Sequence, residues 1–188
     1  IGFAFFLNLF FAIAEIIGGL WTNSLAILSD ALHDLGDSLI LGLSWFLERY
    51  STKGRSLRYS YGYRRFSLLG ALLNAVILIA GSVFIITEAI PRLMHPEPAN
   101  AVGMMWFAIA GVILNGIAVL RLRSRGTSMN ARVVAWHLIE DVLGWIAVLI
   151  VSIVMQFWHL PILDPILSLL IASYILYYNV LLKFTKKQ

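Results

Sequence analysis

The chain has 188 residues, of which 60% are apolar and only 13% are charged, with a formal net charge of +4. Soluble domains are roughly 45–50% apolar and about 25% charged, so this composition excludes an ordinary soluble enzyme and a disordered segment. The chain contains no cysteine, which excludes disulfide scaffolds, zinc ribbons, iron–sulfur clusters and thiol nucleophiles. An all-α membrane protein is the fold class that this balance favours.

Six stretches are long enough to cross a bilayer, whose apolar core takes roughly 20 residues of helix. Four of them carry almost no charge, whereas the second and the fifth hold acidic residues and histidine. A hydropathy scan alone should therefore miss the second. Because proline cannot continue a helix, we expect Pro91 to end the third. We predict one six-helix transmembrane domain over residues 1–188, with helices at 2–21, 24–48, 66–90, 101–123, 129–157 and 164–183.

The basic residues predict the orientation. Thirteen of the 14 lysines and arginines lie on one side, between the second and third helices, between the fourth and fifth, or after the sixth. Arg92 is the exception. Cytoplasmic loops of membrane proteins carry an excess of basic residues, so we expect both termini in the cytoplasm. The basic charge then anchors the topology, and we expect no nucleic-acid partner.

Six carboxylates fall well inside the predicted spans, away from the span ends, and each costs about 2.5–3.5 kcal/mol at the centre of a membrane helix. No lysine or arginine lies at a comparable depth to pair with them. What remains is protonation, a water-filled cavity or a bound cation. The six residues are Glu15, Asp30, Asp34, Asp37, Glu140 and Asp141.

The spacing of two histidines and two of these aspartates predicts a metal site. His33 and Asp37 are four residues apart and share a helix face, and His137 and Asp141 repeat that spacing on the fifth helix. The two helices run in opposite directions, so the pairs can face each other near the middle of the bilayer. Two imidazoles and two carboxylates suit tetrahedral Zn²⁺, with Cd²⁺, Co²⁺ and Fe²⁺ as competitors.

Five other polar residues of the spans could orient the ligands or relay protons, and four of them have a plainer alternative. Asp30 could instead bond to a neighbouring hydroxyl, and Asn8 and Glu15 could bond across helices. Glu140 could pair with a loop arginine. Asp34 and Glu140 are extra carboxylates, each beside a predicted ligand. The five are Asn8, Glu15, Asp30, Asp34 and Glu140.

Several motifs resemble those of one family, the cation diffusion facilitators. The run Ser24-Leu-Ala-Ile-Leu-Ser-Asp-Ala-Leu-His33-Asp-Leu-Gly-Asp37 resembles the second helix of that family. Tyr61-Gly62-Tyr63 resembles the entry to its third helix, Glu88-Ala-Ile-Pro-Arg92 the end of that helix, and Asp164-Pro165-Ile-Leu-Ser168 the start of its sixth. The resemblance follows the chain in order over essentially its whole length.

The resemblance implies six helices, a homodimer, and exchange of a divalent metal for protons, with no cofactor besides the transported ion. It assigns His33, Asp37, His137 and Asp141 as ligands of that ion, and Zn²⁺ as the first choice. Members usually continue into a cytoplasmic metal-binding domain, which residues 1–188 do not hold. The loop between the fourth and fifth helices is not histidine-rich, which favours a multi-pass protein of a bacterial inner membrane.

We therefore expect a transporter that exports Zn²⁺ in exchange for protons, and not an enzyme. Two alternatives stay open at this point. A proton-independent channel or uniporter would use the same four ligands. An intramembrane zinc metalloenzyme could use Glu140 as its base, but catalytic zinc sites keep one position open, which a symmetric four-residue set disfavours.

Overall fold

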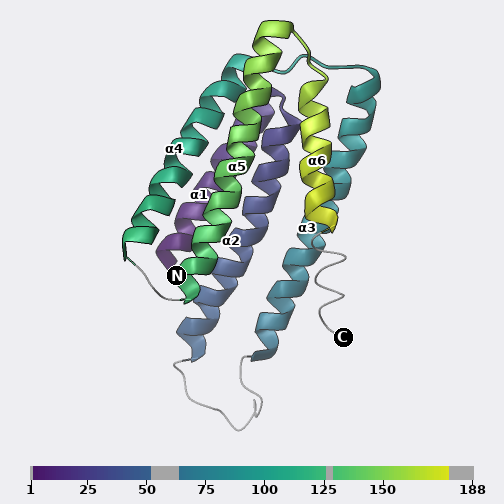
Figure 1. The fold of residues 1–188 in the computed structure, drawn as a ribbon. Coiled ribbons are helices and arrows are strands. Elements are labelled where there is room, and N and C mark those ends of the chain that lie inside the picture. The colour runs from purple at the N-terminus through teal and green to yellow at the C-terminus, as the bar shows by residue number, and fades with distance from the viewer. Residues whose placement is uncertain (1, 52–63, 126–128, 178–188) are drawn as a thin grey trace.

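The computed structural model describes residues 2–51, 64–125 and 129–177, with side chains over residues 5–43, 45–46, 72–121 and 138–177. The described residues form six α-helices and no strand (Figure 1). The helices are α1 (Gly2–Thr22), α2 (Leu25–Ser51), α3 (Arg64–Met94), α4 (Ala101–Arg125), α5 (Met129–Trp158) and α6 (Leu163–Tyr177).

The boundaries of α1, α2, α4 and α5 agree with the predicted spans to within three residues. The last part of the predicted 164–183 span lies outside the described residues. The prediction that Pro91 ends the third helix is wrong, because α3 continues to Met94 with Pro91 inside it. Proline removes its own N–H donor and crowds the carbonyl four residues earlier, but the Pro91 carbonyl still accepts a hydrogen bond from the His95 amide at 2.8 Å.

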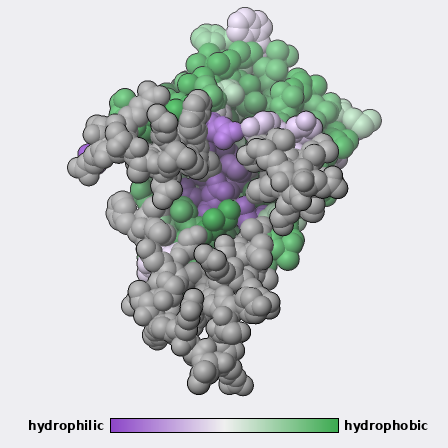
Figure 2. Space-filling model, turned by 60° about the horizontal axis from the view of Figure 1, so that its bottom comes forward, coloured by the Kyte–Doolittle hydropathy of each residue, from purple (hydrophilic) through white to green (hydrophobic). Residues whose placement is uncertain are grey.

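Within the described residues, four helices are long and apolar enough to cross a membrane, over Phe5–Thr22, Leu72–Met94, Ala101–Arg121 and Leu138–Trp158. As expected from its acidic residues, α2 does not meet the same hydropathy criterion, and α6 is apolar but described over only 15 residues. All six helices expose large apolar side chains, and hydrophobic residues form much of the visible surface (Figure 2). Examples are Phe10, Phe46, Leu72, Leu120, Leu143 and Leu170. Such a surface is typical of a protein whose outside meets lipid.

The helices pack in neighbouring pairs: α1 lies along α2, α4 along α5, and α3 against both α2 and α6 (Figure 1). Short connections at residues 23–24, 95–100 and 159–162 lie at one end of the bundle, which we call the turn end. At the opposite end, which we call the loop end, α2 finishes and α3 begins.

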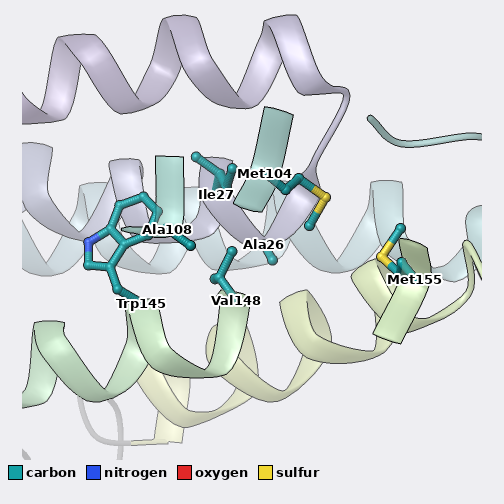
Figure 3. Close-up of a cluster of buried hydrophobic side chains, with 7 residues drawn as sticks. All are labelled: Ala26, Ile27, Met104, Ala108, Trp145, Val148 and Met155. Carbon is teal, nitrogen blue, oxygen red and sulfur yellow. The ribbon is translucent and has the colours of Figure 1, made fainter. Parts of the chain in front are cut away.

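A cluster of buried apolar side chains joins α2, α4 and α5 (Figure 3). Trp145 of α5 is its largest member and packs against Gly111 of α4, where an added Cβ would overlap the indole ring. Trp145 follows Asp141 by one helical turn, so this packing fixes the height and rotation of α5 at the predicted ligand. The cluster contains Ala26, Ile27, Met104, Ala108, Trp145, Val148 and Met155.

The turn between α1 and α2 is a tight Schellman turn. Asn23 takes a left-handed conformation with φ of 55°, which asparagine tolerates better than most residues. The Ser24 amide donates to the Gly19 carbonyl at 3.0 Å, and the Asn23 amide donates to Leu20 at 3.4 Å. The chain therefore reverses within two residues, and α2 starts at a defined angle to α1.

Asp164 of α6 caps the beginning of α2. Its Oδ2 accepts from the Leu25 amide at 2.8 Å, and its Oδ1 accepts from the Ser24 hydroxyl at 2.6 Å and the Ala26 amide at 3.3 Å. The Ser24 hydroxyl oxygen in turn accepts from the Ile27 amide at 3.2 Å. A carboxylate at a helix N-terminus satisfies amides that have no partner within the helix. The cap ties α6 to the helix that carries His33 and Asp37.

Two further contacts hold the same turn. Arg92 donates from Nη1 to the Asn23 carbonyl at 3.0 Å and pairs with Glu97 at 3.3 Å. The Asn100 amide donates to the Thr22 carbonyl at 2.8 Å. Arg92, the one basic residue that the charge pattern places on this side, thus has a local structural partner.

Candidate metal site

A cavity of about 450 Å³ lies between α2, α3, α5 and α6. With the loop end turned forward, hydrophilic residues are visible in a hollow at the centre of the molecule (Figure 2). Three of the four predicted ligands line the cavity: His33 and Asp37 from α2, and Asp141 from α5. Among the described residues, the lining is Asp30, His33, Asp37, Ile40, Asn74, Leu78, Glu140, Asp141, Gly144, Leu170, Ile171, Tyr174 and Ile175.

On the α2 wall, the side chains of His33 and Asp37 point to the same region. The distance from His33 Nε2 to Asp37 Oδ2 is 3.8 Å, and the two side chains are 27% and 21% exposed. Two ligands of a tetrahedral zinc ion, each bound at about 2.1 Å, would lie about 3.4 Å apart. The observed separation is therefore close to the one that a shared ion needs.

On the α5 wall, Asp141 is buried, with 9% of its surface exposed. His137 belongs to α5 and precedes Asp141 by one turn, but its side chain lies outside the described residues. Among the side chains that are described, no three of the histidine, aspartate and glutamate type are close enough to hold one metal ion. The joint site of four residues thus stays a prediction, with its described members on two walls of one cavity.

Asp30 and Glu140 line the same cavity. The Tyr174 hydroxyl of α6 donates to Glu140 Oε1 at 2.7 Å, a length typical of a hydrogen bond to a carboxylate. This bond bridges α5 and α6 on an exposed part of the cavity wall. Tyr174 thus supplies a partner for Glu140 that neither of the two sequence-based alternatives included.

Asn8, Glu15 and Asp34 are not among the residues that line the cavity. The Asn8 amide donates at 3.0 Å both to the Ser38 hydroxyl and to the Asp34 backbone carbonyl. The buried Glu15 forms a side-chain hydrogen bond with Asp34, and Asp30 and Asp141 lie within electrostatic range of it. A hydrogen bond between two carboxyl groups needs one proton. These residues join α1 to α2 behind the ligand-bearing face.

Sequence reasoning assigned no site role to Asn74 or Tyr174, although both line the cavity. A single carboxamide in the apolar third helix was the available signal for Asn74. Tyr174 had no such signal, because it is one of three tyrosines in the predicted 164–183 span.

Comparisons with known proteins give a consistent result. The family described as the cation efflux transmembrane domain matches residues 1–182. The zinc transporter ZitB of Pectobacterium atrosepticum is 36% identical over 175 residues, which is 92% of this chain and 55% of that protein. The ZitB of Escherichia coli is 31% identical over 93% of this chain and 56% of its own length.

A third relative, the cadmium, cobalt and zinc/H(+)-K(+) antiporter of Bacillus velezensis, is 36% identical over 169 residues, 88% of this chain and 54% of that protein. The chain therefore spans about half the length of the curated relatives that it matches.

Proposed function

The chain belongs to the cation efflux family, the cation diffusion facilitators, and from this premise we propose that it exports divalent metal ions across a membrane. Zn²⁺ is the first substrate that we propose, and protons move in exchange. The relatives named as zinc transporters and as a cadmium, cobalt and zinc/H(+)-K(+) antiporter support this class of substrate. They also support a carrier rather than an enzyme.

The membrane placement is part of the proposal. Four helices with the length and hydropathy of spans support an integral membrane protein, and relatives from bacteria support a bacterial inner membrane. We propose that α2 and α6 complete six spans and that the loop end, which carries most basic residues, faces the cytoplasm. The homodimer rests on the family resemblance alone.

The observation that carries the proposal is the cavity lined by His33, Asp37 and Asp141. Three metal-ligating side chains on two helices would be costly in the middle of a membrane protein unless a cation or water compensated them. With His137 added from the preceding turn of α5, the set supplies two imidazoles and two carboxylates. That set matches the preference of zinc for nitrogen and oxygen ligands in a tetrahedral site.

Competition at this site explains how metal and protons would exchange. A metal ion needs neutral imidazole and ionised carboxylate, so its arrival displaces protons and their return displaces the ion. A cavity reached from the loop end would take the ion from the cytoplasm. The same four side chains, opened to the opposite side, would take protons and release the metal, as alternating access requires.

Zinc flux into proteoliposomes, measured with and without an imposed pH gradient, tests the proposal. The protein is compared with Asp37→Asn, which keeps the shape of the side chain and removes its charge, and with His137→Ala. Ser152→Ala serves as the control, because Ser152 is fully buried on α5, donates to the Leu149 carbonyl, and does not line the cavity. We expect gradient-dependent flux that Ser152→Ala retains and the two site variants lose.

Each other outcome identifies a different function. Flux that needs His137 and Asp37 but ignores the pH gradient would make the protein a channel or uniporter. Flux that Asp37→Asn and His137→Ala retain would overturn the site. A protein that binds no divalent metal and transports none would overturn the proposed function itself.

A further inference from the structure

Among the described side chains of α3, Asn74 is the one polar residue that lines the cavity. Its side chain is 1% exposed, and its Oδ1 atom is buried without a hydrogen-bond partner. Buried polar atoms without a partner are rare in native proteins, and each calls for a physical explanation such as an ion or a water. An apolar residue of the same size would avoid this cost, so packing alone does not account for the asparagine.

The carboxamide of Asn74 lies against α2 between the two ligands of that helix. A Cβ placed on Gly36 would lie 2.5 Å from Asn74 Oδ1 and 2.9 Å from Leu78 Cδ2, so only a glycine accepts this approach. Gly36 follows His33 by three residues and directly precedes Asp37. The glycine therefore brings the carboxamide to the turn of α2 from which His33 and Asp37 enter the cavity.

The orientation of the carboxamide is adjustable. The terminal torsion of asparagine joins a tetrahedral and a planar carbon, and its energy profile is broad. In the proposal below, rotation about this torsion turns the oxygen from Gly36 towards the cavity that Asn74 lines. The oxygen has no hydrogen bond to give up in that rotation.

We propose that Asn74 is a further ligand of the transported cation, binding it through the carboxamide oxygen beside His33 and Asp37. This inference rests on the proposed function and extends its site to α3. A carboxamide oxygen is a neutral, hard donor that oxygen-preferring divalent ions accept readily. Asn74 thus raises the affinity of the site and helps ions that take more than four ligands, such as Cd²⁺ and Co²⁺.

The carboxamide differs from the other ligands because it does not titrate. Protons compete with the metal for imidazole and carboxylate groups, whereas they do not compete for an amide oxygen. The contribution of Asn74 to metal affinity is therefore the same at every pH. Loss of Asn74 should weaken binding without moving the pH dependence, and loss of His33 should change both.

The test uses the purified protein in detergent, with Zn²⁺ affinity measured by competition with a chelating dye and stability measured by thermal unfolding with chelator and with Zn²⁺. Asn74→Leu removes the oxygen and keeps the number and branching of the side-chain heavy atoms, and Asn74→Asp keeps an oxygen donor. Ser152→Ala is the control away from the cavity. We expect Asn74→Leu to unfold at the same or a higher temperature in chelator, because an unsatisfied polar group is removed.

The affinity of Asn74→Leu for Zn²⁺ should fall about tenfold or more, as it does when groups that support a metal site are lost. Asn74→Asp should keep binding within a few-fold of the unchanged protein, and the pH midpoint of Asn74→Leu should not move. Zinc affinity that Asn74→Leu retains would overturn the inference while leaving the proposed function intact.

If Asn74→Leu unfolds at a lower temperature than the unchanged protein, the Zn²⁺ affinity of Asn74→Asp becomes the test. Weak zinc binding by a stable Asn74→Asp protein would also overturn the inference. A wild-type protein without any zinc response would overturn both this inference and the function on which it rests.

Discussion

The two parts of α2 are held in opposite ways. At the turn end, the buried carboxylate of Asp164 accepts hydrogen bonds from Ser24, Leu25 and Ala26. Backbone hydrogen bonds hold the adjoining turn. Halfway along α2, His33 and Asp37 line a cavity. The Oδ1 atom of Asn74, which lies against the same helix, has no hydrogen-bond partner. The capped end is built for stability, whereas the middle borders a cavity where the buried Asn74 oxygen is left for a ligand or water to satisfy.

The largest effect that tests this difference is expected at the cavity. Asp141→Asn should lower zinc affinity and flux by more than about a hundredfold, beyond the loss usual for groups that merely support a metal site. Unfolding in chelator should change little, since the cavity is not the stabilising region. Dye competition and proteoliposome flux measure the loss. Strong zinc binding by Asp141→Asn would remove Asp141 from the proposed ligand set.

At the capped end the pattern should reverse. Asp164→Ala leaves the Ser24 hydroxyl and two amides without an acceptor, and each unsatisfied group costs about 1–3 kcal/mol, so the free energy of unfolding should fall by about 3 kcal/mol or more. Chemical unfolding in detergent micelles measures this loss, with Asp164→Asn as an intermediate case that keeps one acceptor oxygen. A normal unfolding free energy would show that the cap does not hold α2.

A smaller effect is expected where α4 supports α5. Gly111→Ala adds a methyl group that overlaps the ring of Trp145, and overpacking of this kind typically costs about 1–3 kcal/mol. Because Trp145 lies one turn from Asp141, zinc affinity should fall as well, but by less than in Asp141→Asn. Thermal unfolding and dye competition on one preparation separate the two effects. An unchanged unfolding temperature would mean that α4 and α5 can move apart to fit the methyl group without a loss of stability.

The smallest effect is expected on the exposed part of the cavity wall. Tyr174→Phe removes only the hydroxyl that donates to Glu140, and a single hydrogen bond of this kind contributes about 1 kcal/mol. Zinc flux should stay within a few-fold of the unchanged protein. A loss of flux as large as that of Asp141→Asn would instead assign Glu140 a direct part in moving metal or protons.

Much of this arrangement could be predicted from local patterns. The spacing of His33 and Asp37 shows on its own that both side chains share a helix face, and both line the cavity. Helix positions followed from apolar length, and the end of α3 was missed because the rule for proline ignores the carbonyl that Pro91 still offers.

Contacts between distant residues were beyond prediction for a physical reason. Asp164 and Leu25 are far apart in sequence, and nothing local to either residue indicates that one caps the helix of the other. Glu140 is similar, since its partner Tyr174 comes from another helix and resembles an interfacial tyrosine. The role of Gly36 depends wholly on what α3 places against it. Such features depend on how helices pack, which helix periodicity does not contain.

The Schellman turn at Asn23 limits how the length of this chain can vary. One residue inserted between Asn23 and Leu25 would either rotate α2 by about 100° or separate its first amides from Asp164. The rotation would carry His33 and Asp37 out of the cavity together. The hairpin of α1 and α2 should thus accept many substitutions but no insertion or deletion at its turn, and an alignment gap at this position would indicate a protein with a different site.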